Sequence, residues 1–283
     1  MPELESVPEL VEPVMVVAFE GWNDAGDVAS GAVDHLATTW DAHNLLTLDA
    51  DDYYDYQVAR PRTSTVGGVS QGVVWPSTRV SVARPDGQPS DMVLVRGVEP
   101  NMRWRGFSSD LLTVARELDV RQVVLLGALL ADAPHTRPVP VTTVASSSDL
   151  ARSLNLEPTA YDGPTGILGV LQDTCAAAGL DSVALWAAVP HYFAQPPCPK
   201  GTLSLLRKVE DILDVTIPLG DLPEEARAWE HGVDELASED SDIASYVRSL
   251  EEAKDAAELP EASGDAIARE FERYLRRRDT GHS

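Results

Sequence analysis

Polar side chains that could bind a ligand or move a proton recur in loops that directly follow runs of apolar residues. The runs that precede these loops are 14–19, 92–95, 123–126 and 183–187. In open α/β sheets, ligands bind in the crevice at the carboxyl ends of the strands, where such loops meet. These loops, with one further loop that opens a helix, supply ten candidate ligand-binding residues: Glu20, Asn23, Asp24, Glu99, Arg103, His135, Arg137, Tyr161, His191 and Tyr192.

The first two loops each allow a structural interpretation beside the functional one. In the loop Glu20–Gly26, Asn23 or Asp24 can cap the following helix, and the free N–H groups of the first helical turn can also hold an anion. In the second loop, Glu99 and Arg103 could bind a polar ligand. They could equally pair with each other and hold the loop. Residue types alone leave both interpretations open.

The third and fourth loops, Pro134–Pro138 and Pro190–Tyr192, each contain a proline followed by a histidine. Histidine suits proton transfer or metal binding near neutral pH, although a lone histidine is more often a hydrogen-bonded structural group. Arg103 and Arg137 could each hold a carboxylate or a single phosphate through two hydrogen bonds. No metal-ligand spacing accompanies the histidines, so we expect no metal and no cofactor.

The loop Tyr161–Gly166 could cradle an anion or could simply start a helix with Pro164 in its first position. Standard catalytic and nucleotide-binding motifs are missing, namely G-x-x-x-x-G-K-[ST], G-x-G-x-x-G and H-E-x-x-H. Gly68–Gly72 fits the hydrolase pattern G-x-S-x-G, which requires a strand, a sharp turn and a helix. Strand-like residues and a proline follow instead. We therefore reject Ser70 as a nucleophile, and the catalytic residues of any reaction stay unknown.

The elements that would position these loops alternate between strand and helix. Strand patterns occupy 14–19, 45–49, 73–75, 79–83, 92–95, 123–126, 141–144 and 183–187; helical patterns occupy 24–40, 104–118, 165–178 and 201–213. We expect a loop over the polar residues 50–64. The alternation predicts a mostly parallel sheet with helices on both faces.

The composition changes near residue 220. Residues 221–283 hold 18 acidic and 8 basic residues and no strand pattern. Apolar residues recur there at helical spacing in three stripes: Ala226, Trp229, Val233 and Leu236; Ile243, Val247 and Leu250; Ile267, Phe271 and Leu275. Residues 251–261 are rich in Ala and Glu and read as a flexible connector. The predicted organisation is an N-terminal tail (1–13), an α/β domain (14–220) and an acidic helical appendage (221–283).

Charge and composition exclude several classes of protein. The chain has 283 residues, with 22 Lys+Arg against 46 Asp+Glu and a net charge of −24. Such a surface repels phosphate, so we expect no nucleic acid or membrane partner. Two cysteines cannot build a disulfide framework, and neither a secretory signal nor a long apolar span is present, which favours a cytoplasmic protein. The apolar stripes on short acidic helices predict a homo-oligomer.

Five ordered motifs resemble the actinobacterial branch of the proteasome assembly chaperone 2 family: Glu20–Gly26, Glu99–Trp104, Pro134–Pro138, Tyr161–Gly166 and Pro190–Tyr192. The resemblance runs from about residue 14 to about residue 255. It implies a three-layer α/β/α fold similar to purine nucleoside phosphorylases. Bacterial members mostly have no assigned activity. Eukaryotic and archaeal relatives chaperone proteasome assembly, several through a C-terminal hydrophobic-Tyr-X tripeptide that the ending Asp279–Ser283 lacks.

Two functional hypotheses follow. The first is a non-enzymatic assembly chaperone-like or binding protein, homo-oligomeric and with a proteasome-related protein partner. The alternative is a phosphorylase- or hydrolase-type enzyme that acts on a small polar or anionic substrate at the strand-end loops. The convergence of polar groups favours the alternative, whereas the lack of an identifiable nucleophile and base favours the first.

Overall fold

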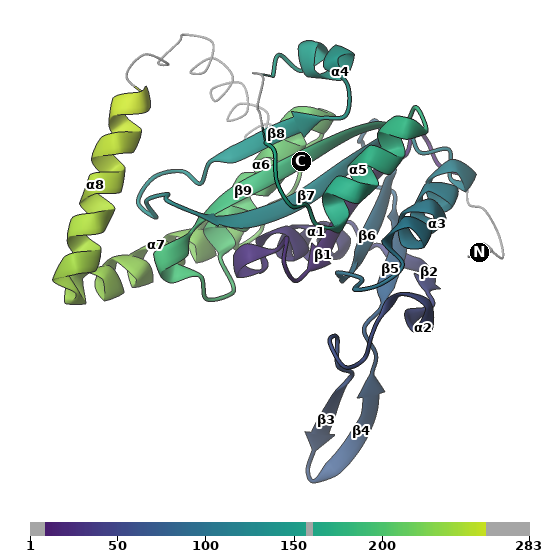
Figure 1. The fold of residues 1–283 in the computed structure, drawn as a ribbon, viewed down its shortest axis with the longest axis horizontal. Helices are drawn as coiled ribbons and strands as arrows, with labels where there is room; N and C mark the ends of the chain where they lie inside the picture. The colour runs from purple at the N-terminus through teal and green to yellow at the C-terminus, as the bar shows by residue number, and fades with distance from the viewer. Residues whose placement is uncertain (1–8, 157–160, 259–283) are drawn as a thin grey trace.

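A seven-stranded sheet forms the centre of the molecule, in the order β2-β5-β6-β1-β7-β9-β8 (Figure 1). The computed structural model describes residues 9–156 and 161–258. The strands of this sheet are β1 (Val14–Glu20), β2 (His43–Leu48), β5 (Thr78–Ala83), β6 (Met92–Val98), β7 (Gln122–Ala131), β8 (Val141–Ala145) and β9 (Asp181–Pro190). Strands β6, β1, β7 and β9 are parallel, so their carboxyl ends lie at one edge of the sheet. Strands β5 and β8 run antiparallel to their neighbours.

Helices cover both faces of the sheet, which confirms the predicted three-layer α/β/α architecture. They are α1 (Val28–Thr39) and α6 (Pro199–Leu213) on one face, and α3 (Trp104–Glu117) and α5 (Ile167–Ala177) on the other. Successive residues of a strand point to opposite faces. In β1, Val16 and Ala18 therefore join the core under α1 and α6, whereas Val17 and Phe19 join the core under α3 and α5. This explains why the central strands read as continuous apolar runs.

The segment between β2 and β5 differs from the sequence prediction. The expected loop over 50–64 contains helix α2 (Ala50–Tyr53) and the start of strand β3 (Arg62–Val66). Strand β3 pairs with β4 (Val69–Val74) in a separate hairpin that projects from the body (Figure 1). Gly67 and Gly68 both have positive φ, which suits the tight turn of such a hairpin. Ser70 lies in an exposed strand of this hairpin and not at a strand-to-helix turn.

Two further helices, α7 (Leu222–Glu239) and α8 (Ser241–Glu258), follow the sheet domain. Helix α7 packs on α6, and α8 packs on α7. The predicted flexible connector is wrong for 251–258, because α8 continues through them and contacts a strand-end loop. Residues 259–261 and the stripe of Ile267, Phe271 and Leu275 lie outside the described residues. Short helices complete the described chain: α4 (Ser148–Ser153) and the 3₁₀ turns Ala25–Asp27 and His191–Phe193.

Candidate functional site

Asn23 and Glu99 meet at the N-terminus of helix α5. Asn23 lies in the loop after β1 and its Nδ2 donates to Glu99 Oε1 at 2.7 Å. The same oxygen accepts from the backbone N–H of Ile167, the first residue of α5, at 3.0 Å. A carboxylate is stabilised at this end of a helix by the exposed N–H groups and the helix dipole. The protein's own Glu99 therefore occupies the position where the sequence suggested an external anion.

The surroundings of Asn23 leave no room for a ligand. Its side chain is 1% exposed, and its Oδ1 is buried without a hydrogen-bond partner in the described part of the chain. A Cβ atom at Gly166 would overlap the Asn23 amide, so the glycine allows this close approach. The sequence suggested that Pro164 is the first residue of this helix. Helix α5 instead begins at Ile167, directly after Gly166.

Asp24 acts as a cap for helix α1, which is the structural interpretation that its residue type allowed. Its Oδ1 accepts from the backbone N–H groups of Ala29 at 2.7 Å and Ser30 at 3.1 Å. Burial raises the pKa of Asp24, and the hydrogen bonds from Ser30 and Ala29 oppose that rise. The side chain is directed into the protein and not toward a ligand.

Three other candidates lie away from these contacts. Arg103 forms an ion pair with Asp52, so the suggested Glu99–Arg103 pair is wrong. Glu20 Oε1 forms an ion pair with Arg96 at 2.9 Å. Tyr161 is 77% exposed and its hydroxyl donates to the carbonyl of Pro164, within its own loop.

The remaining candidates gather at the ends of β7 and β9, around His135. The backbone N–H of His135 donates to the Tyr192 hydroxyl at 2.8 Å. That hydroxyl lies 2.7 Å from His135 Nδ1, so it is left to donate to this nitrogen. His135 Nε2 then carries the ring proton and donates to Asp234 Oδ1 of helix α7 at 2.9 Å. Lys200 of α6 donates to the His135 carbonyl and to Glu230 of α7.

Asp234, His135 and Tyr192 form a hydrogen-bonded series of a carboxylate, an imidazole and a hydroxyl. A catalytic triad contains the same three kinds of group in the same order. An activated hydroxyl would need a lowered pKa and access to substrate. Burial instead raises the pKa of Tyr192 to about 12, and its hydroxyl faces the backbone of His135. The arrangement therefore holds helix α7 against the sheet edge rather than generating a nucleophile.

Helix α8 is held by the same loop. Arg137 Nε and Nη2 donate to the two carboxylate oxygens of Asp255 at 2.9 and 2.8 Å. This is the two-bond carboxylate contact that the sequence suggested for a ligand, and the hydrogen bonds from Arg137 lower the pKa of Asp255. His191 Nδ1 lies 3.2 Å from Asp132, and its ring packs edge-on against Tyr246 of α8.

Seven of the ten candidates thus form two groups at the carboxyl edge, and the structure adds partners that sequence reasoning missed. The added partners are Lys200, Glu230, Asp234, Tyr246, Glu251 and Asp255. One signal for them is present in the sequence. Glu230 and Asp234, and likewise Glu251 and Asp255, are four residues apart, which places each pair of carboxylates on one face of a helix.

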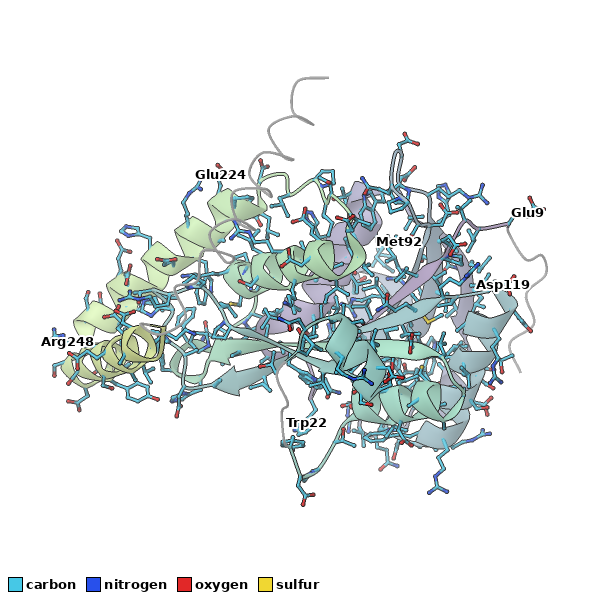
Figure 2. All side chains as sticks on the ribbon, turned by 90° about the horizontal axis from the view of Figure 1, so that it is seen from above. Glu9, Trp22, Met92, Asp119, Glu224 and Arg248 are labelled. Carbon is cyan, nitrogen blue, oxygen red and sulfur yellow. The ribbon has the colours of Figure 1, made fainter. Side chains whose placement is uncertain are left out.

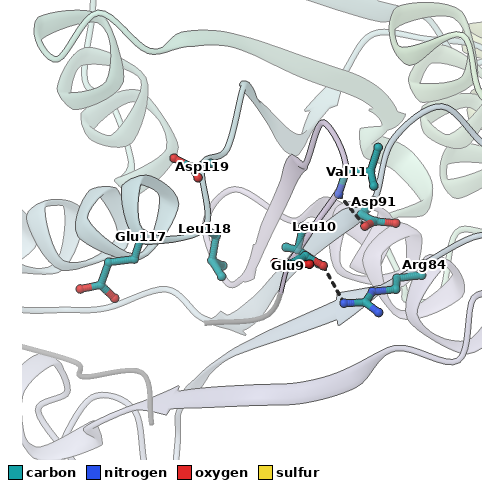
Figure 3. A pocket seen from close by; sticks show the side chains of 8 residues that line it. All are labelled: Glu9, Leu10, Val11, Arg84, Asp91, Glu117, Leu118 and Asp119. Carbon is teal, nitrogen blue, oxygen red and sulfur yellow. Dashed lines mark hydrogen bonds between the residues drawn. The ribbon is translucent and has the colours of Figure 1, made fainter. Parts of the chain in front are cut away.

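Two pockets lie elsewhere on the molecule. One has a volume of about 580 Å³ and lies near the amino ends of the strands, where Arg84, Asp91 and Asp119 line it (Figure 3). The other is a groove of about 710 Å³ between α3 and α5, flanked by Arg105 and Arg116. None of the ten candidates lines either pocket. Within 9–156 and 161–258, no group of three or more His, Cys, Asp or Glu side chains could hold a metal ion.

A mostly parallel sheet between two helical layers, with strand-end loops fastened to C-terminal helices, defines the chain as a three-layer α/β/α protein. The chain belongs to the PAC2 family, whose family model matches residues 18–237. This confirms the resemblance drawn from the five motifs. No helix in the described ranges is long and apolar enough to cross a membrane.

Solved structures support the same assignment. A PAC2 family protein from Streptomyces avermitilis is 60% identical, with a TM-score of 0.78 over 83% of this chain and 99% of that one. A proteasome-assembly chaperone homologue from Mycobacterium tuberculosis is 55% identical, with a TM-score of 0.77 and the same coverage. PbaB of Pyrococcus furiosus, an archaeal proteasome activator, shares the fold at 17% identity, with a TM-score of 0.65 over 83% of this chain and 97% of that one. No curated protein sequence matches this chain.

Proposed function

We propose that this chain is a non-enzymatic, assembly chaperone-like protein of the cytoplasm, which self-associates and binds a proteasome-related protein partner. The similarity to a proteasome-assembly chaperone homologue supports the class of partner. The observation that carries the proposal is the engagement of the strand-end side chains. His135, Arg137 and Glu99 bond to other parts of this chain, and none of them lines either of the two pockets described above.

The alternative enzymatic function is less well supported by the same geometry. A general base must reach the proton that it abstracts. Both ring nitrogens of His135 already have partners, and its side chain is 1% exposed. His191 is partly exposed, but its Nδ1 lies 3.2 Å from Asp132.

A binding experiment tests the proposal. The full chain is immobilised, and purified α- and β-subunits of an actinobacterial 20S proteasome are passed over it. We expect saturable binding of proteasome subunits, and a faster appearance of assembled particles on native gels when the chain is added. Serum albumin and an unrelated acidic protein serve as controls.

Two results would refute the proposal. One is the absence of subunit binding at the highest soluble concentration. The other is turnover of a nucleoside or phosphoester substrate by the wild type that the His135→Ala variant lacks.

A further inference from the structure

The β3–β4 hairpin exposes an unusual amount of apolar surface. We call residues 57–75 the arm. Its exposed large apolar side chains are Val58, Val66, Val69, Val73, Val74 and Trp75. Every residue of β3 and β4 is exposed, and the two strands pair only with each other. A lone two-stranded hairpin is marginally stable in water, and its unpaired edges invite another chain. The arm therefore has the properties of a surface that another polypeptide covers when the protein functions.

The charge of the arm differs from that of the rest of the molecule. Residues 57–75 contain Arg60 and Arg62 and no acidic residue, in a chain whose net charge is −24. Two arms repel each other, whereas an arm and an acidic surface attract. The arm is thus electrostatically suited to the body of another acidic molecule.

A matching surface lies at the carboxyl edge of the sheet. We call Trp22, Met102 and Tyr161 the platform; their side chains are 65%, 40% and 77% exposed. Figure 2 shows Trp22 at the edge of the molecule. The three come from different loops, which the hydrogen bonds of Asn23 and Glu99 fasten together.

Residue types and charge both suit the platform to protein binding. Trp, Tyr and Met are enriched at protein interfaces. Trp and Tyr are also enriched among the few interface residues that contribute most of the binding energy. The same loops contain the exposed acid Asp162, together with Glu20, which pairs with Arg96, and Arg103, which pairs with Asp52. An apolar partner with positive charge suits this surface, because the chain as a whole carries a net charge of −24.

The base of the arm lies beside the platform. The backbone N–H of Asp55 donates to Asn101 Oδ1 at 2.6 Å, and the Tyr54 hydroxyl donates to the Val98 carbonyl at 2.8 Å. Asn101 directly precedes Met102. The arm points away from its own body (Figure 1), so it can reach a neighbouring molecule.

We propose that the arm of one copy docks on the platform of a second copy. This inference rests on the self-association in the proposed function and names the two surfaces that produce it. The contact joins apolar to apolar and basic to acidic surface. Because arm and platform are different surfaces, the contact closes either as an isologous dimer, in which two copies exchange arms reciprocally, or as a heterologous ring.

Sedimentation velocity of the full chain over a micromolar concentration series tests the contact. The arm variant is Val66→Asp with Val69→Asp, and the platform variant is Trp22→Ala with Tyr161→Ala. Val11→Asp is the control, because Val11 is 66% exposed near the amino ends of the strands, outside both surfaces and outside the apolar stripes of the C-terminal helices. We expect each arm or platform variant to weaken self-association by about tenfold or more, as the loss of buried apolar side chains predicts. We expect the control variant to have the same association constant as the wild type. Thermal melts verify that all variants fold.

Mixing the variants decides which surfaces touch. The arm variant retains an intact platform, and the platform variant retains an intact arm, so an equimolar mixture regains complexes that neither forms alone. Complexes that stay absent in the mixture, variants that associate like the wild type, or a wild type that is monomeric throughout would each overturn the inference. Proteasome subunits that fail to bind an oligomeric wild type would instead overturn the proposed function and leave the contact standing.

Discussion

Replacing His135 with alanine should be far more destabilising than replacing His191. His135 is 1% exposed, and its ring bonds to the Tyr192 hydroxyl at 2.7 Å and to the Asp234 carboxylate at 2.9 Å. A neutral hydrogen bond contributes about 1 kcal/mol, and one to a charged group about 1.5–3 kcal/mol. Adding the lost packing of a buried ring, we expect His135→Ala to lower the free energy of unfolding by about 3–4 kcal/mol.

His191 provides the matched control. Its ring has one polar contact, at 3.2 Å to Asp132, and the side chain is 44% exposed. A contact of this kind contributes at most about 1 kcal/mol. Guanidinium chloride unfolding at neutral pH, followed by circular dichroism, measures both variants. Equal losses for the two variants, or a loss below about 1 kcal/mol for His135→Ala, would refute the role assigned to the buried ring.

Four further predictions follow from buried groups and helix geometry. Burial raises the pKa of Asp24 above the unfolded value of 3.8, so its contribution to stability falls as pH rises through the folded pKa; in unfolding titrations, Asp24→Asn should gain stability relative to the wild type as the pH rises above 3.8. Glu99→Ala leaves two donors unpaired and should cost about 2–4 kcal/mol in denaturant unfolding, against less for Glu99→Gln, which keeps an acceptor. Burial raises the pKa of Cys175 and Cys198 to about 11, so Ellman's reagent at pH 8 should label neither thiol before denaturation and both after it. Gly232→Ala in α7 meets no atom within 4 Å and should raise the melting temperature, through a gain of about 0.5–1 kcal/mol.

The sheet domain could be predicted because its central strands are buried on both faces and read as continuous apolar runs. Residues 14–19 and 123–126 are examples, and both strands lie inside the central parallel group. Strand β3 of the arm was missed and β4 was predicted only from residue 73, because these strands have no buried face. Without burial there is no apolar alternation to mark β3, and the polar residues 50–64 read as loop.

The candidate site shows where sequence reasoning ends. Spacing places Glu99 and His135 after strands, and the structure places both at the carboxyl edge. The partners that decide what these side chains do are distant in sequence: Glu99 bonds to Ile167, 68 residues away, and His135 to Asp234, 99 residues away. No local pattern encodes such a pairing. It depends on the path of α7 and α8 across the strand ends, which is set by packing.

The long separations between the loops and the last helices also set an order of events during synthesis. Strand β9 ends at Pro190, so the whole sheet has been translated well before Asp234 and Asp255. Domains fold from the N-terminus as the chain emerges. Asp255, the partner of Arg137, is translated 118 residues after it, and Asp234, the partner of His135, is translated 99 residues after it. A chain truncated near residue 220 would lack the carboxylates that these polar groups contact here. Docking of α7 and α8 on the strand-end loops must therefore follow translation of the whole sheet.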